Sequence, residues 1–284
     1  MMILQALIFD VDGTLAETEE IHRKAFNQAF SEAGLDWHWS QEHYRKLLTI
    51  SGGKERIRHF IHNISHDSDE YKSFLEAVAE NKLEPLDDTS LNLWIASLHL
   101  LKGAHYAEIM AAGEIELRPG VERLIREAHH NGLRLAIATT TSMENITALF
   151  NATMGNEVLD WFEVIGAAEQ APVKKPDPSV YLWVLQQLDL PGSQCLAIED
   201  THNGVCAATG ADIPVLITQS YYSEGEDFSG AVTVLTDLGE PDSPYRILAN
   251  VNTDVNSDFS NKADRMNTFV DVEQLRYWAS TINE

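Results

Sequence analysis

The sequence predicts an α/β fold with a doubly wound, mostly parallel sheet and an all-helical insertion. Short runs rich in Ile, Leu and Val occur near the N-terminus and recur after Arg118, where they alternate with segments of helical periodicity. Residues 17–112 instead contain amphipathic helical patterns and no convincing strand. The expected strands are 3–9, 133–139, 162–167, 194–199, 213–218 and 231–235.

The helices between these strands are predicted from apolar spacing. Over 121–128 and again over 181–188, apolar residues stand at i, i+3, i+4 and i+7, the spacing that lines one face of a helix. Asp177 and Pro178 occupy the positions expected of the N-cap and first residue of the second of these helices. Helices of this kind should cover a parallel sheet, whose ligands bind beyond the carboxyl ends of the strands.

The insertion and the C-terminal part differ from this alternation. We assign residues 1–16 and 113–284 to the core domain and residues 17–112 to a helical cap domain. The polar run at 250–262 predicts a loop, and a last helix is expected near 271–281. The helices expected in the cap are 18–33, 40–48, 54–63, 70–80 and a long one near 90–112.

Composition limits the ligand and the cellular setting. With 20 basic and 44 acidic side chains the net charge is −24, which disfavours binding to nucleic acid or to anionic membranes and favours a small, metal-neutralised ligand. No apolar run approaches the ~20 residues of a membrane span. The start MMILQALIFD lacks a basic n-region, and no transit peptide is seen. We expect a monomer located in the cytoplasm, or in the plastid stroma if plant-derived, with Cys195 and Cys206 as reduced thiols.

Two aspartates follow the first strand in LIFDVDGT. The chemistry that needs them is phosphoryl transfer, with Asp10 as a carboxylate nucleophile and Asp12 passing protons to the leaving oxygen and from water. A calcium loop is disfavoured because Gly13 comes too early after Asp12 for an EF-hand. A simple turn would explain Asp12-Gly13 but not Asp10 at the strand end.

Three other segments carry polar groups at strand ends or in a loop. In CLAIEDTHNG, Glu199 and Asp200 follow a strand and offer oxygens for Mg²⁺, together with Asp10 and the backbone carbonyl of Asp12. In LAIATTTSMEN, Thr139 stands where a hydroxyl and free N–H groups would hold phosphate, although the threonines and serine also suit helix capping. Lys175 in VKKPDP is a further candidate, and a solvated loop lysine is the alternative.

The motifs DVDGT, ATT, KKPDP and IEDTHNG occur in this order and resemble the haloacid dehalogenase superfamily of phosphatases and phosphomutases, from residue 3 to about 240. The resemblance implies a Rossmann-like core and a mobile cap that closes to exclude water. By it, Asp10 is the nucleophile, Asp12 the acid/base, and Thr139 and Lys175 are phosphate ligands. The implied ligands of Mg²⁺ are Asp10, Asp12, Glu199 and Asp200.

Within that superfamily, GTLAETEEIHRKAFN, SGGKERI and LRPGVERLI look most like CbbY-type sugar-phosphate phosphatases. The implied substrate is xylulose 1,5-bisphosphate, an inhibitor of rubisco. SGGKERI is not a Walker loop, but a helix start at Gly52-Gly53 beside Lys54 and Arg56 would bind a second phosphate. The implied substrate contacts are Glu17, His22, Tyr44, Lys54, Arg56, Lys102, Thr140 and Asn203.

Three points stay open at this level. A β-phosphoglucomutase-like phosphomutase would share the same motifs, and a non-catalytic sugar-phosphate sensor or partner-binding protein would keep the same fold. Lys102 shares a helix face with Tyr106, which amphipathic packing alone would also explain. The tail 241–284 departs from the pattern expected of the family, and the sequence predicts no role for it.

Overall fold

The computed structural model of the chain describes residues 4–50, 52–80, 87–113, 115–171, 173–250 and 268–281. It divides into two compact units, each considered by itself. The core unit is Met1–Glu17 with Ile115–Glu284, and the cap unit is Thr18–Glu114. In the part of the chain that is described, no helix has both the length and the apolar composition needed to cross a membrane.

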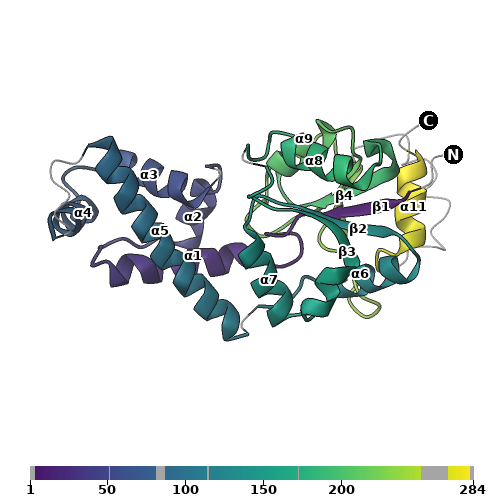
Figure 1. Cartoon of the computed structure of the whole chain (residues 1–284), viewed down its shortest axis with the longest axis horizontal. Helices are drawn as coiled ribbons and strands as arrows, with labels where there is room; N and C mark the ends of the chain where they lie inside the picture. The colour runs from purple at the N-terminus through teal and green to yellow at the C-terminus, as the bar shows by residue number, and fades with distance from the viewer. Residues whose placement is uncertain are drawn as a thin grey trace. The chain divides into compact units, whose positions relative to one another are not determined.

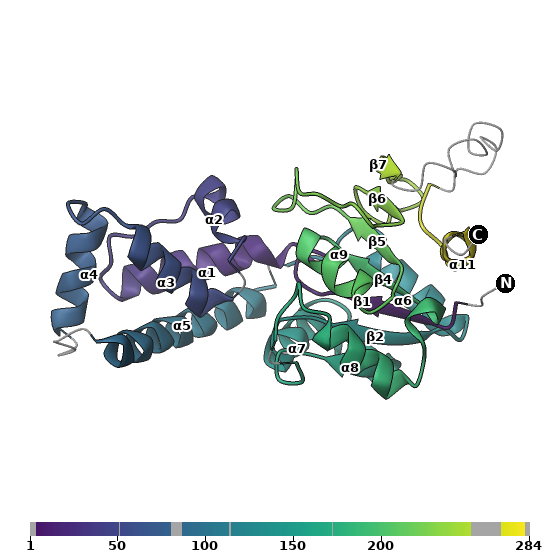
Figure 2. The same cartoon turned by 90° about the horizontal axis from the view of Figure 1, so that it is seen from above.

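The core unit is built on a seven-stranded sheet with the order β3-β2-β1-β4-β5-β6-β7. Figure 1 labels β1 to β4, and Figure 2 labels β5 to β7. The first six strands pair in parallel, and β7 pairs antiparallel with β6. The strands are β1 (Ala6–Phe9), β2 (Arg134–Ala138), β3 (Phe162–Gly166), β4 (Cys195–Glu199), β5 (Val215–Thr218), β6 (Thr233–Leu235) and β7 (Ile247–Asn250).

Strand β1 lies between β2 and β4, and this determines where the polar residues meet. Phe9, its last residue, is in register with Ile137 of β2 and Ile198 of β4. The residues that follow these three strands therefore emerge at one edge of the sheet. All four residues of β1 are buried, as continuous apolar strands covered on both faces require.

Helices cover both faces of the sheet. Figure 1 shows α8 and α9 over one face and α6 and α7 over the other. On the first of these faces, side chains of α8 and α9 form a buried cluster with Ile8 and Ala136. The core unit also has 3-10 turns at Asn156–Trp161 and Gly192–Gln194. Its helices are α6 (Val121–His130), α7 (Met143–Ala152), α8 (Ser179–Leu188), α9 (His202–Thr209) and α11 (Val272–Thr281).

The C-terminal part adds a strand that the sequence did not predict. β7 has only four residues, and its antiparallel partner lies more than ten residues earlier, so no local pattern announces it. Helix α11 forms where a last helix is expected, and the backbone N–H of Val272 donates to the Glu127 carboxylate of α6 at 3.0 Å. The predicted loop at 250–262 lies outside the described residues beyond Asn250.

One helix start also differs from the prediction. Helix α8 begins at Ser179, with Pro178 rather than Asp177 at the N-cap position. Asp177 still acts at this end, because its carboxylate accepts a hydrogen bond from the backbone N–H of Ser179 at 2.9 Å. Asp177 lies two residues before the first helical residue and still accepts from an N–H group at the helix start, which is the capping role that the sequence predicts for it.

In its described residues the cap unit has five helices, each within two residues of an expected segment, and Figure 2 shows α5 running beside α1. Aromatic rings fill its interior: Trp39 packs on Phe26 and Phe30 with ring centroids 4.8 Å apart in both pairs. Asp87 caps α5 by accepting from the backbone N–H of Ser90 at 2.7 Å, so this helix starts earlier than predicted. The helices are α1 (Thr18–Glu32), α2 (Gln41–Leu47), α3 (Gly53–Asn63), α4 (Asp69–Glu80) and α5 (Asp88–Ala111).

Candidate active site

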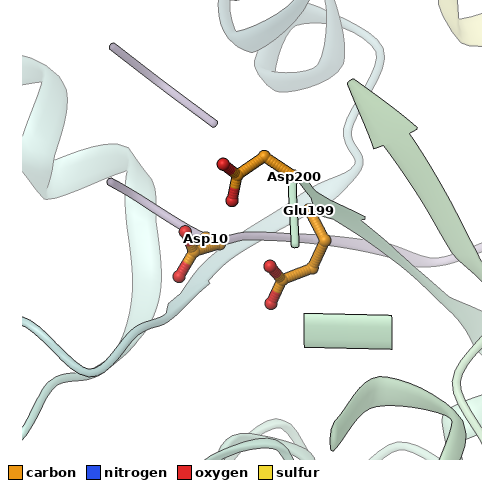
Figure 3. Close-up of side chains that lie close together, drawn as sticks. All are labelled: Asp10, Glu199 and Asp200. Carbon is orange, nitrogen blue, oxygen red and sulfur yellow. The ribbon is translucent and has the colours of Figure 1, made fainter. Parts of the chain in front are cut away.

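Three carboxylates meet at the carboxyl ends of two adjacent strands. Asp10 directly follows β1, Glu199 ends β4 and Asp200 follows it. Each offers an oxygen within 4.8 Å of the others, and all three side chains are buried. Figure 3 shows the three side chains gathered where these strands end. The convergence predicted from strand-end positions is therefore a property of the structure.

Lys175 lies among these carboxylates and is not a solvated loop residue. Its side chain is 6% exposed, and Nζ donates to Asp10 Oδ1 and Glu199 Oε1, both at 2.6 Å. The third donor bond goes to the carbonyl of Ala138, the last residue of β2, at 2.8 Å. An ammonium has three N–H donors, so these three bonds use all of them.

Tyr181, in the first turn of α8, is part of the same network. Its hydroxyl donates to Glu199 Oε1 at 2.5 Å, and its ring centroid lies 5.2 Å from Lys175 Nζ. Sequence analysis placed Tyr181 only on the apolar face of the helix. The available signal was a hydroxyl in an otherwise aliphatic row, since a fully buried tyrosine normally finds a hydrogen-bond partner.

Burial dominates the electrostatics of Asp10. Removal from water raises the pKa of Asp10 to about 7, against the stabilising charge of Lys175. Repulsion from Glu199 and Asp12 contributes to this rise in the pKa of Asp10. Three carboxylates surround one ammonium group, so the cluster has too little positive charge to balance them when they are ionised.

Asp200 is affected still more strongly. Burial raises its pKa well above the usual range, and the charges of Asp10 and Glu199 add to the effect. A hydrogen bond from the Ser220 side chain and the charge of Arg118 oppose the rise. Asp200 is 3% exposed, so water cannot supply the missing compensation.

The donor set fits a divalent cation. Within the described residues, Glu199 Oε2 and Asp200 Oδ1 are buried without a hydrogen-bond partner. Orphaned buried carboxylate oxygens are costly unless a cation binds them, and Mg²⁺ prefers oxygen ligands of this type. Asp10, Glu199 and Asp200 would hold such an ion.

The turn that carries Asp12 is shaped by a glycine. Asp12 is half-buried, and Gly13 has a φ of 83°, a conformation that favours glycine. A Cβ atom at Gly13 would lie 2.1 Å from Asp200 Oδ2. Gly13 of the motif is thus required both by the backbone conformation and by the close approach to Asp200.

The loop after β2 contains Thr139, one of the two predicted phosphate ligands. Thr139 is 2% exposed, its backbone N–H donates to the Gly166 carbonyl at 2.9 Å, and its Oγ1 accepts from the N–H of Thr141 at 3.3 Å. Ser142 caps α7, which confirms the helix capping that the sequence also predicts for this segment. Thr140 in this loop and Asn203 on α9 are both half-buried.

Two predicted substrate contacts of the cap unit share one network with Glu19. The Tyr44 hydroxyl donates to Glu19 Oε2 at 2.8 Å and accepts from Arg56 Nη1 at 3.0 Å. Arg56 Nε also donates to the carbonyl of Ile50 at 3.0 Å. Lys54 is exposed in the first turn of α3, next to the cap residue Gly52. The expected helix start is confirmed, and Arg56 is held while Lys54 extends into solvent.

His22 and Lys102, which are also predicted substrate contacts, form a buried cluster with Tyr106. Lys102 Nζ lies 2.5 Å from His22 Nδ1, and both side chains are less than 9% exposed. Since an ammonium only donates, His22 Nδ1 is the acceptor and its ring proton is on Nε2. His22 stacks on Tyr106 at 4.3 Å, and Lys102 Nζ lies 4.7 Å from the same ring centroid. Apolar packing alone therefore does not explain the helix face that Lys102 and Tyr106 share, because a buried polar contact lies at its centre.

The sequence of the chain is similar to those of known proteins over most of its length. A family model described as haloacid dehalogenase-like hydrolase matches residues 4–212. The chain is 46% identical over 237 residues to Protein CbbY of Rhodobacter capsulatus, covering 84% of this chain and 95% of the relative. It is 45% identical over 241 residues to Protein CbbY, plasmid, of Cupriavidus necator, covering 85% and 88%.

Two solved structures are similar over most of the chain. CbbY from Rhodobacter sphaeroides in complex with phosphate is 42% identical with a TM-score of 0.70. A D10N mutant of that protein in complex with xylulose-(1,5)bisphosphate is 41% identical with the same TM-score. Each similarity covers 83% of this chain and 95% of the other.

Proposed function

The chain belongs to the haloacid dehalogenase-like hydrolases, and from this premise we propose that it hydrolyses xylulose 1,5-bisphosphate to release inorganic phosphate. The single observation that carries the chemistry is the buried contact between Asp10 and Lys175 at the end of β1. The substrate is supported by the solved CbbY mutant in complex with xylulose-(1,5)bisphosphate.

The first half-reaction uses Asp10 and Asp12. Lys175 occupies Oδ1 of Asp10, which leaves Oδ2 to attack phosphorus. As the Asp10–phosphorus bond forms, the bond between phosphorus and the sugar oxygen breaks, and Asp12 gives that oxygen a proton. The product is an aspartyl phosphate on Asp10.

The second half-reaction regenerates the enzyme. Asp12, now ionised, takes a proton from water, whose oxygen attacks phosphorus while the bond to Asp10 breaks. Thr139 would hold a phosphoryl oxygen through both steps, and its position beside β1 supports this assignment. Lys175 would do the same by exchanging one of its three bonds in the site for a phosphoryl oxygen. Asp12 returns to its protonated form for the next cycle.

Charge is the main obstacle, because a carboxylate must attack a dianion. When bound, Mg²⁺ would supply positive charge that reduces this repulsion, held by Asp10, Asp12, Glu199 and Asp200. Burial raises the pKa of Asp10 to about 7 even beside Lys175, so a bound cation would also favour the ionised carboxylate that attacks phosphorus.

Substrate choice is assigned to the cap unit. Lys54 and Arg56 would bind the distal phosphate, with Arg56 pre-oriented by its bonds to Tyr44 and Ile50. His22 and Lys102 would contact the sugar or its phosphates. A guanidinium held by two bonds loses less freedom when it binds phosphate than one that is free.

The test is phosphate release with Mg²⁺ from xylulose 1,5-bisphosphate, ribulose 1,5-bisphosphate and β-glucose 1-phosphate. We expect one phosphate per xylulose 1,5-bisphosphate consumed, with the highest kcat/KM for that substrate. Rapid conversion of β-glucose 1-phosphate to glucose 6-phosphate with little free phosphate would identify a phosphomutase instead. Binding of all three without turnover would identify a sensor.

A further inference from the structure

Arg118 is a buried cation outside the predicted site. It follows Leu117, whose backbone bridges to Ala16, and its side chain is 7% exposed. Its guanidinium reaches four separate segments of the core unit. It donates to the carbonyls of Gly13, Thr218 (2.7 Å), Gln219 (2.7 Å) and Thr236 (2.8 Å) and to Thr218 Oγ1 (3.2 Å), and Nε lies 3.3 Å from Glu17 Oε1.

The bond to Gly13 fixes one wall around Asp200. Gly13 lies against the Asp200 carboxylate so closely that a Cβ there would overlap Oδ2. A shift of the Gly13 carbonyl would therefore move both Asp12, its neighbour, and the surface that confines Asp200. Arg118 restrains that carbonyl.

The bonds to the end of β5 fix a second segment near Asp200. The carbonyls of Thr218 and Gln219 immediately precede Ser220, which lies near enough to Asp200 to oppose the rise in the pKa of its carboxyl. Ser220 is itself 3% exposed and paired with Ser223, with 3.0 Å between their hydroxyl oxygens. One guanidinium thus holds the two segments that contact the same carboxylate.

Arg118 also places a second acidic group. Glu17 is 42% exposed, and Nε of Arg118 faces its carboxylate. Because the arginine is fixed by backbone carbonyls, it limits the orientations open to Glu17. Glu17 is among the substrate contacts that the sequence resemblance implies.

We propose that Arg118 is a positioning residue, which sets Asp200 and the Asp12-Gly13 turn for the cation and orients Glu17 toward the substrate. The part concerning Glu17 rests on the proposed function, whereas the part concerning Asp200 requires only that the carboxylates bind a divalent cation. A lysine at this position would keep the positive charge but could not reproduce a planar set of bonds to several carbonyls.

The experiment compares Arg118→Lys with Arg123→Lys in the full chain. Arg123 is a matched control because its guanidinium also donates to three carbonyls of the core unit, those of Leu238, Gly239 and Val270, at 2.9–3.2 Å. It contacts none of the three clustered carboxylates. Mn²⁺ affinity is measured by electron paramagnetic resonance without substrate, at 15 °C, after circular dichroism shows that each variant is folded.

For Arg118→Lys we expect a Mn²⁺ Kd raised about tenfold and a kcat lowered tenfold to a hundredfold. Arg123→Lys should lower Tm by about as much as Arg118→Lys does, while its Mn²⁺ Kd and its kcat stay within twofold of those of the unaltered protein. A loss of Tm alone in Arg118→Lys, or equal losses of metal affinity in both variants, would overturn the proposal. The Mn²⁺ measurement remains informative if xylulose 1,5-bisphosphate is not the substrate.

Two further variants complete the test. If Arg118→Lys does not fold, Thr218→Val removes one acceptor of the guanidinium, and a two- to fivefold rise in the Mn²⁺ Kd is expected; an unchanged Kd overturns the proposal. Where Arg118→Lys folds, Glu17→Gln is combined with it. If Arg118 acts through Glu17, the double variant should lose less kcat/KM than the product of the two single losses, and independent losses would remove Glu17 from the proposal.

Discussion

The polar cluster of the core unit and that of the cap unit are assembled in different ways. In the core, Asp10 and Glu199 stand at the ends of paired strands, so the sheet register brings them together. In the cap, Lys102 meets His22 across two helices, 80 residues apart in the sequence, through side-chain packing on Tyr106. Backbone hydrogen bonds define the first cluster, and the choice of rotamers on packed helices defines the second.

This difference predicts how the two units respond to substitution. A group held by strand register keeps its position when a side chain changes, so its replacement tests chemistry directly. A group held by packing moves when its neighbours change, so its replacement alters selectivity by degrees.

The largest effect is expected for Asp10→Asn. The amide keeps the shape of the side chain but is not a nucleophile, and loss of the covalent step should reduce kcat by about a thousandfold or more. Because β1 holds the position, circular dichroism and Tm should show a folded protein. Turnover of Asp10→Asn above a few per cent, measured by phosphate release, would show that another group attacks phosphorus.

The next effect is expected for Lys175→Met, which removes the cation between Asp10 and Glu199. Breaking a buried ion pair from one side typically costs about 3–5 kcal/mol, because the remaining charges lose their partner. We expect a loss of this order in the free energy of urea unfolding, together with a loss of activity. Lys174→Met, at the neighbouring and half-buried position, serves as the control and should change both quantities little.

The same contrast explains how much the sequence predicted. The fold class and the cluster of Asp10, Glu199 and Asp200 followed from strand-end positions, because parallel strands bring their carboxyl ends to one edge of the sheet. The antiparallel β7 was missed because it has only four residues and pairs with a strand more than ten residues earlier, so no local pattern marks it. Arg118 and Tyr181 were missed because their roles depend on carbonyls and carboxylates contributed by distant segments.

A moderate and selective effect is expected in the cap for Lys54→Ala and Arg56→Ala. Loss of a charge-assisted contact typically costs roughly 1.5–3 kcal/mol, on the order of tenfold to a hundredfold in kcat/KM. The loss should fall on a bisphosphate and spare its monophosphate counterpart, which has no second phosphate to bind. Arg58→Ala, on the same helix and half-buried, is the control. Equal losses on both substrates would place the distal phosphate elsewhere.

The smallest effect is a pH dependence of stability that originates in the cap. The pKa of His99 is lowered from an ordinary value of 6.5 to about 4, chiefly by burial, with contributions from the charges of Lys102, Lys54 and His22 and with Glu55 opposing the change. Its ring lies over the start of α3, where a Cβ at Gly53 would be 2.5 Å from Nε2. The folded protein therefore keeps His99 neutral at a pH where the unfolded chain binds a proton.

The sign of the effect follows from proton counting. Between pH 6.5 and about 4 the unfolded chain binds more protons at this residue, so the free energy of unfolding falls as the pH falls, by at most about 1.4 kcal/mol per pH unit. Above pH 6.5 the contribution is constant. Carboxylates titrate in the same range, so the measurement is the difference in urea-unfolding free energy between the unaltered protein and His99→Gln. That difference should shift in favour of His99→Gln as the pH is lowered from 7 to 5, and a difference independent of pH would show that His99 has the same pKa in the folded and unfolded states.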